Sequence, residues 1–334
     1  MDKILLSHGS GGKLTHELIN KFFLEAFSNP ILEKLDDSAI FEVASNKIAF
    51  STDSYVVDPI FFKGGDIGKL AICGTVNDLS MSGATPLYLS VSFIIEEGFS
   101  ILDLQRIILS MKDTALKAGI KIITGDTKVV EKGSADKIFI NTTGIGIVSK
   151  EINISGSNAQ EGDIVIVSGK IGEHGMAILS EREGLKFDLE IESDCAPLNT
   201  LVSNMLKVTK NIHCLRDLTR GGLVTALNEI ANQSNVGIFI EESAIPIGDG
   251  VKGASEMLGL DPLYIACEGR LICILPTKDV EEILAVMQKN EYGREAKIIG
   301  KVVNNKTNGV YLQTEIGGTR IAEMIIGEQL PRIC

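Results

Sequence analysis

The segment Leu102–Thr124, LDLQRIILSMKDTALKAGIKIIT, decides the fold class of this chain. Its first part, Leu102–Ala118, predicts a helix that Gly119 ends, and Ile120–Thr124 then predicts a strand. Helix and strand patterns alternate in the same way along the rest of the chain. Because such elements pack as helices on sheets, we expect an α/β or α+β fold.

Other predicted elements lie on both sides of this segment. We expect strands at Ala39–Val43, Ile48–Ser51, Ile138–Val148, Ile164–Ser168, Gly237–Glu241, Leu271–Leu275 and Ala296–Val302. We expect helices after the glycine cluster His8–Gly12, from Ile67, from His174, and at Leu198–Val208, Leu223–Gln233 and Val280–Lys289. No repeat with a period of about 20 to 50 residues is visible, which argues against a solenoid or a propeller.

The length of the chain predicts two domains, because 334 residues exceed the size at which one core usually stops growing. The segment Ser155–Gly162 is polar and rich in small residues, so we place the boundary near residue 155. This gives an N-terminal domain at 1–155 and a C-terminal α/β domain at 156–318. We expect a mobile tail at 319–334, whose end at Ile325–Cys334 has no periodicity.

Composition excludes some classes of function. The formal net charge is −12, whereas nucleic-acid binders need a basic surface to displace counterions. The apolar run Ile4–Leu6 is too short for a signal-peptide core, and no later run has membrane-spanning length, so we expect a cytoplasmic protein. The six cysteines form no CxxC pair, which fits a reducing compartment. Five of them fit core positions, and the sixth, Cys334, is the last residue.

The standard glycine-rich phosphate motifs do not fit this sequence. Gly12–Lys13 and Gly68–Lys69 are each followed by leucine, where a P-loop needs serine or threonine. The cluster at Gly9–Leu14 lacks the last glycine of a dinucleotide fingerprint. A nucleotide site in this chain would therefore need another architecture.

Aspartates recur beside the predicted strands and helices. They are Asp37, Asp53, Asp78, Asp126 and Asp217. Carboxylates are hard oxygen ligands, and several that converge from separate loops could hold magnesium on a triphosphate. The series predicts a metal–nucleotide site made by these five residues. For any single aspartate, a helix cap or a turn is the more common role.

Four further residues could carry chemistry. Lys128 lies two residues after Asp126, so both share one side of an extended segment, and Lys128 could contact phosphate or a developing oxyanion. Glu268 lies between apolar stretches, where burial could raise its pKa enough for proton transfer. His8 could touch phosphate, and Cys334 could act as a carrier thiol. The alternatives are a solvated lysine, a glutamate and a histidine in water, and a stray exposed thiol.

Several motifs together resemble one known family. They are His8–Gly12, Asp36–Ala39, Ser51–Asp53, Gly64–Lys69, Asn77–Met81, Thr124–Lys128, Arg216–Gly222 and the ending Pro331–Cys334. From His8 to Cys334 the chain is similar to the HypE family of nickel–iron hydrogenase maturation proteins, and the ending is the most specific mark. The resemblance implies the two-domain α/β fold shared by aminoimidazole ribonucleotide synthetase, selenophosphate synthetase and thiamine-monophosphate kinase.

The resemblance also implies cofactors, a homodimer and site residues. ATP and Mg²⁺ would lie between the domains and near the contact of two N-terminal domains, with the five aspartates as metal ligands. The residues that would bind ATP or its phosphates are His8, Gly9, Gly11, Gly12, Gly64, Gly65, Lys69 and Asn77.

The implied reaction begins when a carbamoyltransferase, HypF, loads the Cys334 thiol with a carbamoyl group. ATP would then phosphorylate the carboxamide oxygen, and loss of phosphate would leave a thiocyanate. Lys128 would neutralise the developing charge and Glu268 would act as the base. The nitrile would pass to iron held by the HypC–HypD complex.

Two other hypotheses stay open at this point. A related kinase or synthetase acting on a small free substrate would not need Cys334. A non-enzymatic scaffold that delivers metal through its terminal thiol would not hydrolyse ATP. The aspartate series argues against the scaffold, and the terminal cysteine argues against the kinase.

Overall fold

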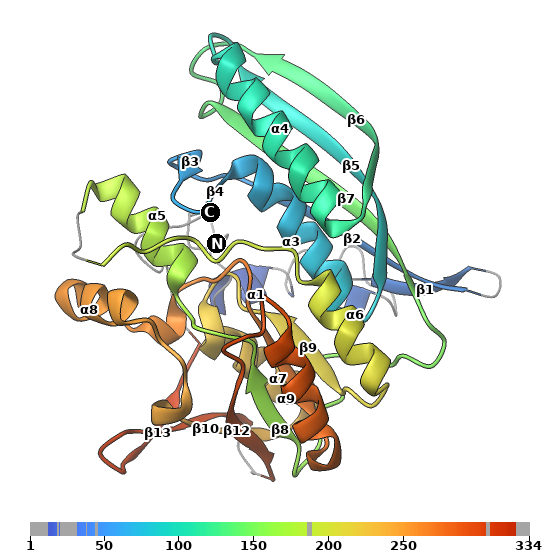
Figure 1. Ribbon diagram of the computed structural model, residues 1–334, viewed down its shortest axis with the longest axis vertical. Coiled ribbons are helices and arrows are strands. Elements are labelled where there is room, and N and C mark those ends of the chain that lie inside the picture. The colour runs from blue at the N-terminus through green and yellow to red at the C-terminus, as the bar shows by residue number, and fades with distance from the viewer. Residues whose placement is uncertain are drawn as a thin grey trace.

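The computed structural model contains two large β-sheets with helices packed against them (Figure 1). It describes residues 13–18, 20, 32–37, 39–43, 46–185, 189–304 and 308–324. The strands of the five-stranded sheet, sheet 1, all lie at or before Val148, and those of the seven-stranded sheet, sheet 2, all lie from Ile164 onward. Residue 155, where the sequence suggests a boundary, falls in the segment between the two sheets.

Sheet 1 has the strand order β1-β2-β7-β5-β6. Its strands are β1 (Ala39–Val43), β2 (Asn46–Tyr55), β7 (Ile138–Val148), β5 (Thr85–Glu96) and β6 (Lys121–Val130). Neighbouring strands are antiparallel except β5 and β6, which are parallel and joined by helix α4 (Ile101–Ala118). Gly119 ends α4 in the left-handed conformation, which confirms the predicted helix stop. Strand β6 lies at the edge of the sheet.

The two faces of sheet 1 have different environments. On the inner face, Leu89, Val91 and Ile140 pack in the core against helices α3 and α4. Side chains at alternate strand positions point to the opposite, outer face. Five large apolar side chains are exposed there among the described residues: Phe50, Tyr88, Ile94, Ile145 and Ile147. Register pairs Ile145 with both Phe50 and Tyr88, so these side chains form a continuous apolar strip.

Helix α3 (Ile67–Met81) lies at the centre of the molecule, and 13 of its 15 residues are buried. A helix that is apolar on all sides needs packing partners all round, and α3 contacts sheet 1, α4, α6 and strand β9. Asp66 caps its start by accepting hydrogen bonds from the N–H groups of Gly68 and Lys69. The short strands β3 (Phe61–Phe62) and β4 (Gly65–Asp66) precede it.

Sheet 2 has the order β14-β13-β10-β12-β8-β11-β9. Its strands are β8 (Ile164–Val167), β9 (Cys214–Asp217), β10 (Gly237–Glu241), β11 (Leu271–Leu275), β12 (Lys297–Val303), β13 (Gly309–Gln313) and β14 (Thr319–Ala322). Its helices are α5 (Glu173–Glu183), α6 (Asn199–Val208), α7 (Gly222–Ser234), α8 (Asp249–Leu258) and α9 (Val280–Lys289). The remaining helical segments are α1 (Lys13–Leu18), η3 (Leu32–Lys34), η4 (Glu242–Ala244), η5 (Pro262–Tyr264) and η6 (Thr277–Asp279).

The central strands of sheet 2 are buried on both faces. Val165 and Val167 of β8 pack with α7, whereas Ile166 between them packs with α6 and α9 on the other side. The same cluster around α6 includes Ala49 and Leu79 from the N-terminal half. Helix α6 therefore joins the two halves through apolar packing, which fixes the junction where side chains of both halves meet.

Most predicted elements are confirmed within a few residues, including β1, β7, β10, β11 and α9 at their exact bounds. The local sequence pattern does not predict β5, β9, α8, β13 or β14. Residues 319–322 were expected in the tail, but they form β14, which pairs antiparallel with β13. The pair Gly125–Asp126 was expected after a strand and lies within β6.

The five cysteines predicted in the core, Cys73, Cys195, Cys214, Cys267 and Cys273, are free and buried. Cys334 lies outside the described residues. Within the described parts of the chain, every helix is too short or too polar to span a bilayer. A cytoplasmic location stays a prediction.

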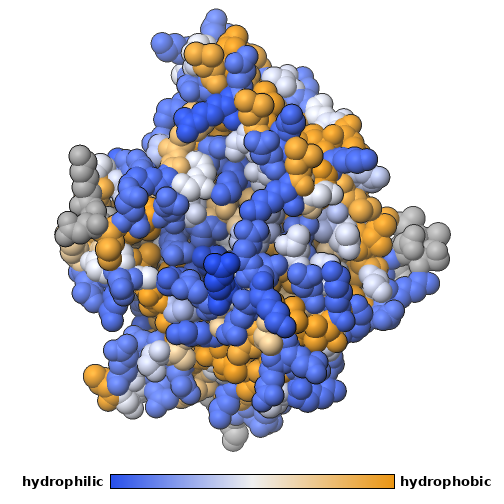
Figure 2. Space-filling view, in the orientation of Figure 1, coloured by the Kyte–Doolittle hydropathy of each residue, from blue (hydrophilic) through white to orange (hydrophobic). Residues whose placement is uncertain are grey.

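The N-terminal half exposes more apolar surface than the C-terminal half. Fourteen of the twenty-one large exposed apolar side chains in the described ranges lie at or before Ile147. Several belong to the outward side of α4, including Ile101, Leu102 and Leu116. Figure 2 shows hydrophobic residues over the upper part of the molecule, where α4 and β6 lie in Figure 1.

Candidate functional site

Four of the five predicted metal aspartates meet at the junction of the two halves, and we call them the acidic cluster: Asp37, Asp53, Asp78 and Asp217. Asp37 precedes β1, Asp53 lies on β2, Asp78 on α3 and Asp217 at the end of β9. Burial raises the pKa of Asp78 well above its usual range, and the charges of the other three raise it further. Carboxylates that act on one another in this way share one buried site.

Burial is also the main cause of the raised pKa of the other members of the cluster. It raises the pKa of Asp37 to about 6, although the Arg216 guanidinium acts in the opposite direction. The pKa of Asp217 lies well above its usual range because of burial and the nearby charge of Asp37. Burial raises the pKa of Asp53, against the effect of Arg220. Because the site disfavours four ionised carboxylates, it favours a bound cation or protonated carboxyl groups.

Arg216 on β9 supplies the main positive charge inside the cluster. Its guanidinium donates to Asp37 Oδ1 and lies 3.0 Å from Glu229 Oε2 on α7. Glu229 Oε1 in turn lies 3.0 Å from His16 Nε2 on α1. This network links the N-terminal segment to the C-terminal half. A separate hydrogen bond of 2.7 Å from Ser51 Oγ orients the Asp78 carboxylate.

The carboxylate oxygens of the acidic cluster are suitable ligands for magnesium that is bound together with phosphate. Asp217 Oδ2 is buried and accepts no hydrogen bond from the described residues. Among these residues, no three His, Cys, Asp or Glu side chains are arranged as a ready metal site. Mg²⁺ commonly takes only one or two carboxylates, with substrate phosphates and water as its other ligands. The cluster therefore fits a metal that arrives with a nucleotide better than a structural ion.

Glu268 lies beside the cluster and is 5% exposed. Burial raises its pKa well above the usual range, and the nearby Cys195, Asp217, Asp194 and Asp53 raise it further. A carboxyl group with a raised pKa can accept and return a proton near neutral pH. The burial predicted for Glu268 from the sequence is confirmed, whereas its role as a base stays a prediction.

Asp126 and Lys128 do not join the acidic cluster within one chain. Register pairs Asp126 with Ser92 and Lys128 with Ile94, so both side chains lie on the outer face of sheet 1. Asp53 pairs with the buried Thr142 and lies on the inner face. Asp126 and Lys128 form an exposed ion pair with an N···O distance of 3.4 Å. Their shared side of an extended segment is confirmed, but their grouping with the other aspartates is wrong for a single chain, because strand alternation separates them.

The predicted phosphate residues near α3 have structural contacts. A Cβ at Gly64, where φ is +88°, would lie 2.6 Å from Ser193 O, so a close backbone approach requires glycine. A Cβ at Gly65 would lie 2.9 Å from the Phe62 ring. Lys69 Nζ donates to Gly64 O at 2.7 Å. A role of this loop in phosphate binding stays a prediction.

The Asn77 side chain is occupied by protein contacts, which argues against its predicted role as a phosphate ligand. It is 2% exposed. Its Nδ2 donates to Ala196 O at 3.0 Å and to Glu268 O at 3.4 Å, and its Oδ1 accepts from Leu198 N–H at 2.7 Å. Asn77 therefore ties α3 to the loop that carries Glu268.

The remaining predicted site residues, His8, Gly9, Gly11, Gly12 and Cys334, lie outside the described residues. The sequence alone assigns no role to Arg216, Glu229 or Asp194. A signal for Arg216 was present, because a charged residue next to the apolar pair Cys214–Leu215 in a short strand indicates a buried ion pair.

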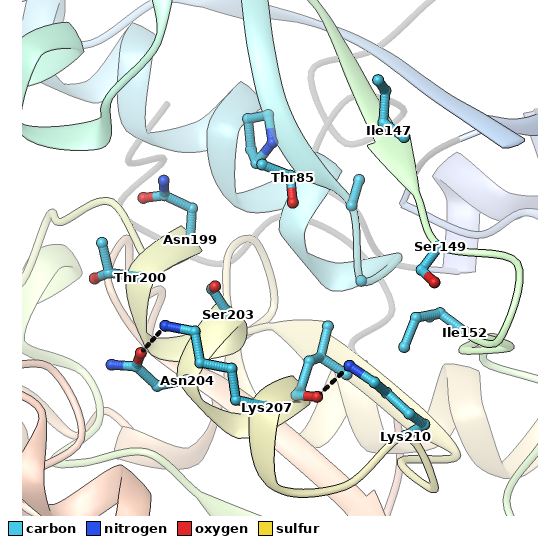
Figure 3. A pocket seen from close by; sticks show the side chains of 14 residues that line it. Thr85, Ile147, Ser149, Ile152, Asn199, Thr200, Ser203, Asn204, Lys207 and Lys210 are labelled. Atoms are coloured by element: carbon cyan, nitrogen blue, oxygen red, sulfur yellow. Dashed lines mark hydrogen bonds between the residues drawn. The ribbon is translucent and has the colours of Figure 1, made fainter. Parts of the chain in front are cut away.

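A separate pocket of about 330 Å³ lies between β5, β7 and α6 and contains two lysines (Figure 3). Lys207 Nζ donates to Asn204 Oδ1 at 3.1 Å, and Lys210 Nζ donates to Leu206 O. Both lysines lie near the C-terminal end of α6, where the helix dipole disfavours an anion. This pocket therefore lacks the features of the predicted nucleotide site.

Comparison with known proteins gives the class first. Residues 35–148 match the family model of the AIR synthase related protein N-terminal domain, and residues 160–313 match that of its C-terminal domain. The chain thus has the two-domain AIR synthase-like fold, as the family resemblance implied.

More similar proteins then give the family. Carbamoyl dehydratase HypE of Cupriavidus necator is 50% identical over 333 residues, which cover 99% of this chain and 95% of that protein. The crystal structure of a HypE–HypF complex matches with a TM-score of 0.88 and 48% identity, covering 92% of this chain and 99% of that one. HypE in complex with ATP matches with a TM-score of 0.84 and 49% identity, covering 99% and 100%. This chain belongs to the HypE family of hydrogenase maturation proteins.

Proposed function

We propose that this chain is an ATP-dependent carbamoyl dehydratase that converts an S-carbamoyl group on Cys334 to a thiocyanate, which supplies the cyanide ligand of nickel–iron hydrogenase. The observation that carries the proposal is Glu268, a buried carboxyl group with a raised pKa beside the acidic cluster. The site combines a proton acceptor with carboxylates suited to a metal-bound triphosphate. The dehydratase name of the relatives and the ATP complex of HypE support the same reaction.

The reaction balances without an oxidant or a reductant. The carboxamide oxygen attacks the γ-phosphorus of ATP and ADP leaves, which converts a poor leaving group into phosphate. Departure of phosphate and loss of both nitrogen protons turn S–C(=O)–NH₂ into S–C≡N. Glu268 accepts a proton from nitrogen, and its low-dielectric surroundings keep the carboxyl group basic enough for this step.

The acidic cluster would hold the nucleotide through Mg²⁺, with Asp217 as its most buried ligand. Mg²⁺ bound there would neutralise phosphate charge and polarise the transferred group. Lys69 and the glycine-rich segment His8–Gly12 would contact the phosphates, as the family resemblance implies. Arg216 holds Asp37 in place and offsets part of the negative charge before the nucleotide binds.

The C-terminal tail can reach Glu268 from the place where the described chain ends. Tyr264 Oη donates to Glu323 O at 3.0 Å, and Tyr264 precedes Glu268 by only four residues, or roughly 14 Å at most. Cys334 lies eleven residues after Glu323, a distance of roughly 36 Å when the chain is extended. The tail is therefore long enough to bring its thiol into the site and to present it to other proteins.

A second copy of this chain would complete the site. Asp126 and Lys128 lie on the outer face of sheet 1, so they can act with the acidic cluster only if it belongs to another copy. The apolar strip at Phe50, Tyr88 and Ile145 on the same face favours association of two N-terminal halves. Lys128 of one copy would then neutralise the charge that develops in the site of the other.

The proposed partners follow the path of the one-carbon group. HypF would load the Cys334 thiol, in line with the HypE–HypF complex of a relative. The HypC–HypD complex would accept the nitrile on iron. The Cys334 thiol would meet each of these proteins in turn.

Intact-protein mass spectrometry tests this function. The chain and its Cys334→Ala variant are incubated with the carbamoyl donor system, with and without Mg-ATP. We expect a carbamoyl adduct only on the native chain, and loss of one water from it only with Mg-ATP. An adduct that never loses water would leave a carrier without dehydratase activity. An adduct on the alanine variant would contradict the role of Cys334.

A further inference from the structure

The direction of the Glu268 side chain depends on how its backbone is held. Glu268 lies in a loop between η5 and β11 rather than in a regular element. Its N–H donates to Asp194 Oδ1 at 3.0 Å, and its carbonyl oxygen accepts from Ala196 N–H at 3.3 Å. A Cβ at Gly269 would lie 1.9 Å from Asp194 O. The turn at Glu268 and Gly269 is therefore seated directly on the segment that contains Asp194.

Burying the Asp194 carboxylate costs more free energy than a hydrogen bond to the Glu268 backbone alone would require. Its side chain is fully buried, and its Oδ2 accepts no hydrogen bond from the described residues. The nearest cation is Arg270, whose Nε lies 3.6 Å from Oδ2 while its NH2 donates to Glu173 at 2.7 Å. An asparagine could accept the same hydrogen bond from Glu268 without the cost of burying a charge. The negative charge itself thus suggests a purpose.

We infer that Asp194 is a positioning residue for Glu268, which fixes the Glu268 backbone by its hydrogen bond and keeps the Glu268 carboxyl group basic by its charge. The inference rests on the proposed function, because it assigns Glu268 the role of base. Asn77 supports the same loop through Glu268 O and is followed in the chain by Asp78. Helix α3 therefore holds the loop of the base through Asn77 and supplies Asp78 to the acidic cluster.

The charges around Glu268 agree with this role. Burial raises the pKa of Glu268 most, and Cys195, Asp217, Asp194 and Asp53 raise it further. Burial and nearby charges, including that of Glu268, raise the pKa of the Tyr55 phenol, so Tyr55 also lies within the electrostatic range of Glu268. Burial raises the pKa of Asp194, whereas Arg270 and the N–H groups of Glu268 and Gly269 favour its charged form. Loss of the Asp194 charge lowers the pKa of Glu268, because a carboxylate ionises more easily away from a like charge.

Two substitutions separate the hydrogen bond from the charge. Asp194→Asn keeps an acceptor for Glu268 N–H and removes the charge, whereas Asp194→Ala removes both. Each full-length variant is loaded with the carbamoyl group, and its single-turnover water loss is followed by mass across pH. We expect the acidic limb of the Asp194→Asn profile to move down by roughly one pH unit. We expect Asp194→Ala to lower the plateau rate by roughly 10–100-fold, as for other supporting contacts, with nucleotide binding unchanged.

Asp163→Asn is the matched control. Asp163 is 3% exposed, accepts a hydrogen bond from Gln160 N–H at 2.8 Å and lies 2.7 Å from His213 Nδ1, away from Glu268. Its substitution should lower thermal stability without moving the pH profile. If the Asp194→Asn profile matches that of the native chain, the inference is wrong, and Asp194 is only a structural residue.

An infrared titration of Glu268, assigned with Glu268→Gln, decides the inference without catalysis. We expect the Glu268 carboxyl band to titrate at lower pH in Asp194→Asn than in the native chain. A native chain that never loses water would overturn the proposed dehydratase, and the infrared titration would still show whether Asp194 controls Glu268. An unchanged titration would overturn the inference alone.

Discussion

The inner and outer faces of sheet 1 carry acidic residues that look alike in the sequence and differ in the folded chain. Asp53 on β2 faces inward and joins Asp37, Asp78 and Asp217 in a buried cluster. Asp126 on β6 faces outward and pairs with Lys128 in solvent. A motif therefore indicates chemistry, while the face of a strand decides which side chains can share one site within a chain.

The largest expected effect comes from removing Arg216, the cation that pairs with the acidic cluster. Arg216→Ala leaves Asp37 and Glu229 buried without their partner, and we expect a loss of about 3–5 kcal/mol in unfolding free energy. Chemical denaturation measures this loss. Arg320→Ala is the matched control, because its pair with Asp261 is largely exposed, and it should cost less than about 1 kcal/mol. Equal losses for the two variants would mean that burial does not distinguish these ion pairs.

A smaller effect follows from the burial of the acidic cluster. The raised pKa of Asp37, about 6 against a usual 3.8, means that the folded state binds this proton more tightly than the unfolded state. Stability without Mg²⁺ and nucleotide should therefore be highest below about pH 4 for this group and decline as the pH rises through 6. Burial and like charges raise the pKa of Asp78 in the same direction.

Asp78→Asn should therefore stabilise the metal-free protein at pH 7 by about 0.5–2 kcal/mol, as substitutions at strained functional sites often do. Thermal unfolding at pH 5 and pH 7 measures the difference, which should shrink at the lower pH. Asp126→Asn on the outer face is the control and should stay within about 0.5 kcal/mol of the native chain. A native-like or lower stability for Asp78→Asn at pH 7 would show that the cluster is not under electrostatic strain.

The smallest expected signal is a partial recovery of activity in mixed dimers, and it is also the most specific test of the two faces. Asp78→Asn and Lys128→Ala should each be nearly inactive alone if both residues serve the proposed site. In a mixed dimer, one composite site carries both changes and the other carries neither. Mixing the two variants after dissociation should therefore restore about a quarter of native activity, as expected for random pairing in a twofold dimer. If no activity returns, the site does not use the outer face of a second copy.

Local patterns predicted most elements because hydrophobic periodicity and helix stops act over a few residues. Gly119 ends α4 as expected, and the apolar run Leu271–Leu275 forms β11. The long strand β5 lacked a clear signal because its inner residues are buried while its outer residues include Tyr88 and Ile94, so simple alternation of apolar and polar side chains is lost. Strand β14 was assigned to the tail because it is a short, exposed strand.

The candidate site was predicted in part. The sequence indicated the acidic residues and Glu268, because carboxylates beside apolar stretches are unusual and often functional. Arg216 and Asp194 were missed because their roles depend on partners far away in the chain, Glu229 and Glu268. Asn77 was assigned to phosphate, yet its amide bridges two segments of the C-terminal half.

The sequence by itself determined the alternating elements, the fold class, the family resemblance and the set of carboxylates available for chemistry. Each of these depends on residue type and local spacing, which the chain carries before it folds. Only the tertiary structure decided that Asp37, Asp53, Asp78 and Asp217 converge while Asp126 does not. The strand pairing of sheet 1 and the packing of α3 and α6 between the halves make that choice, because they set which side chains are buried together.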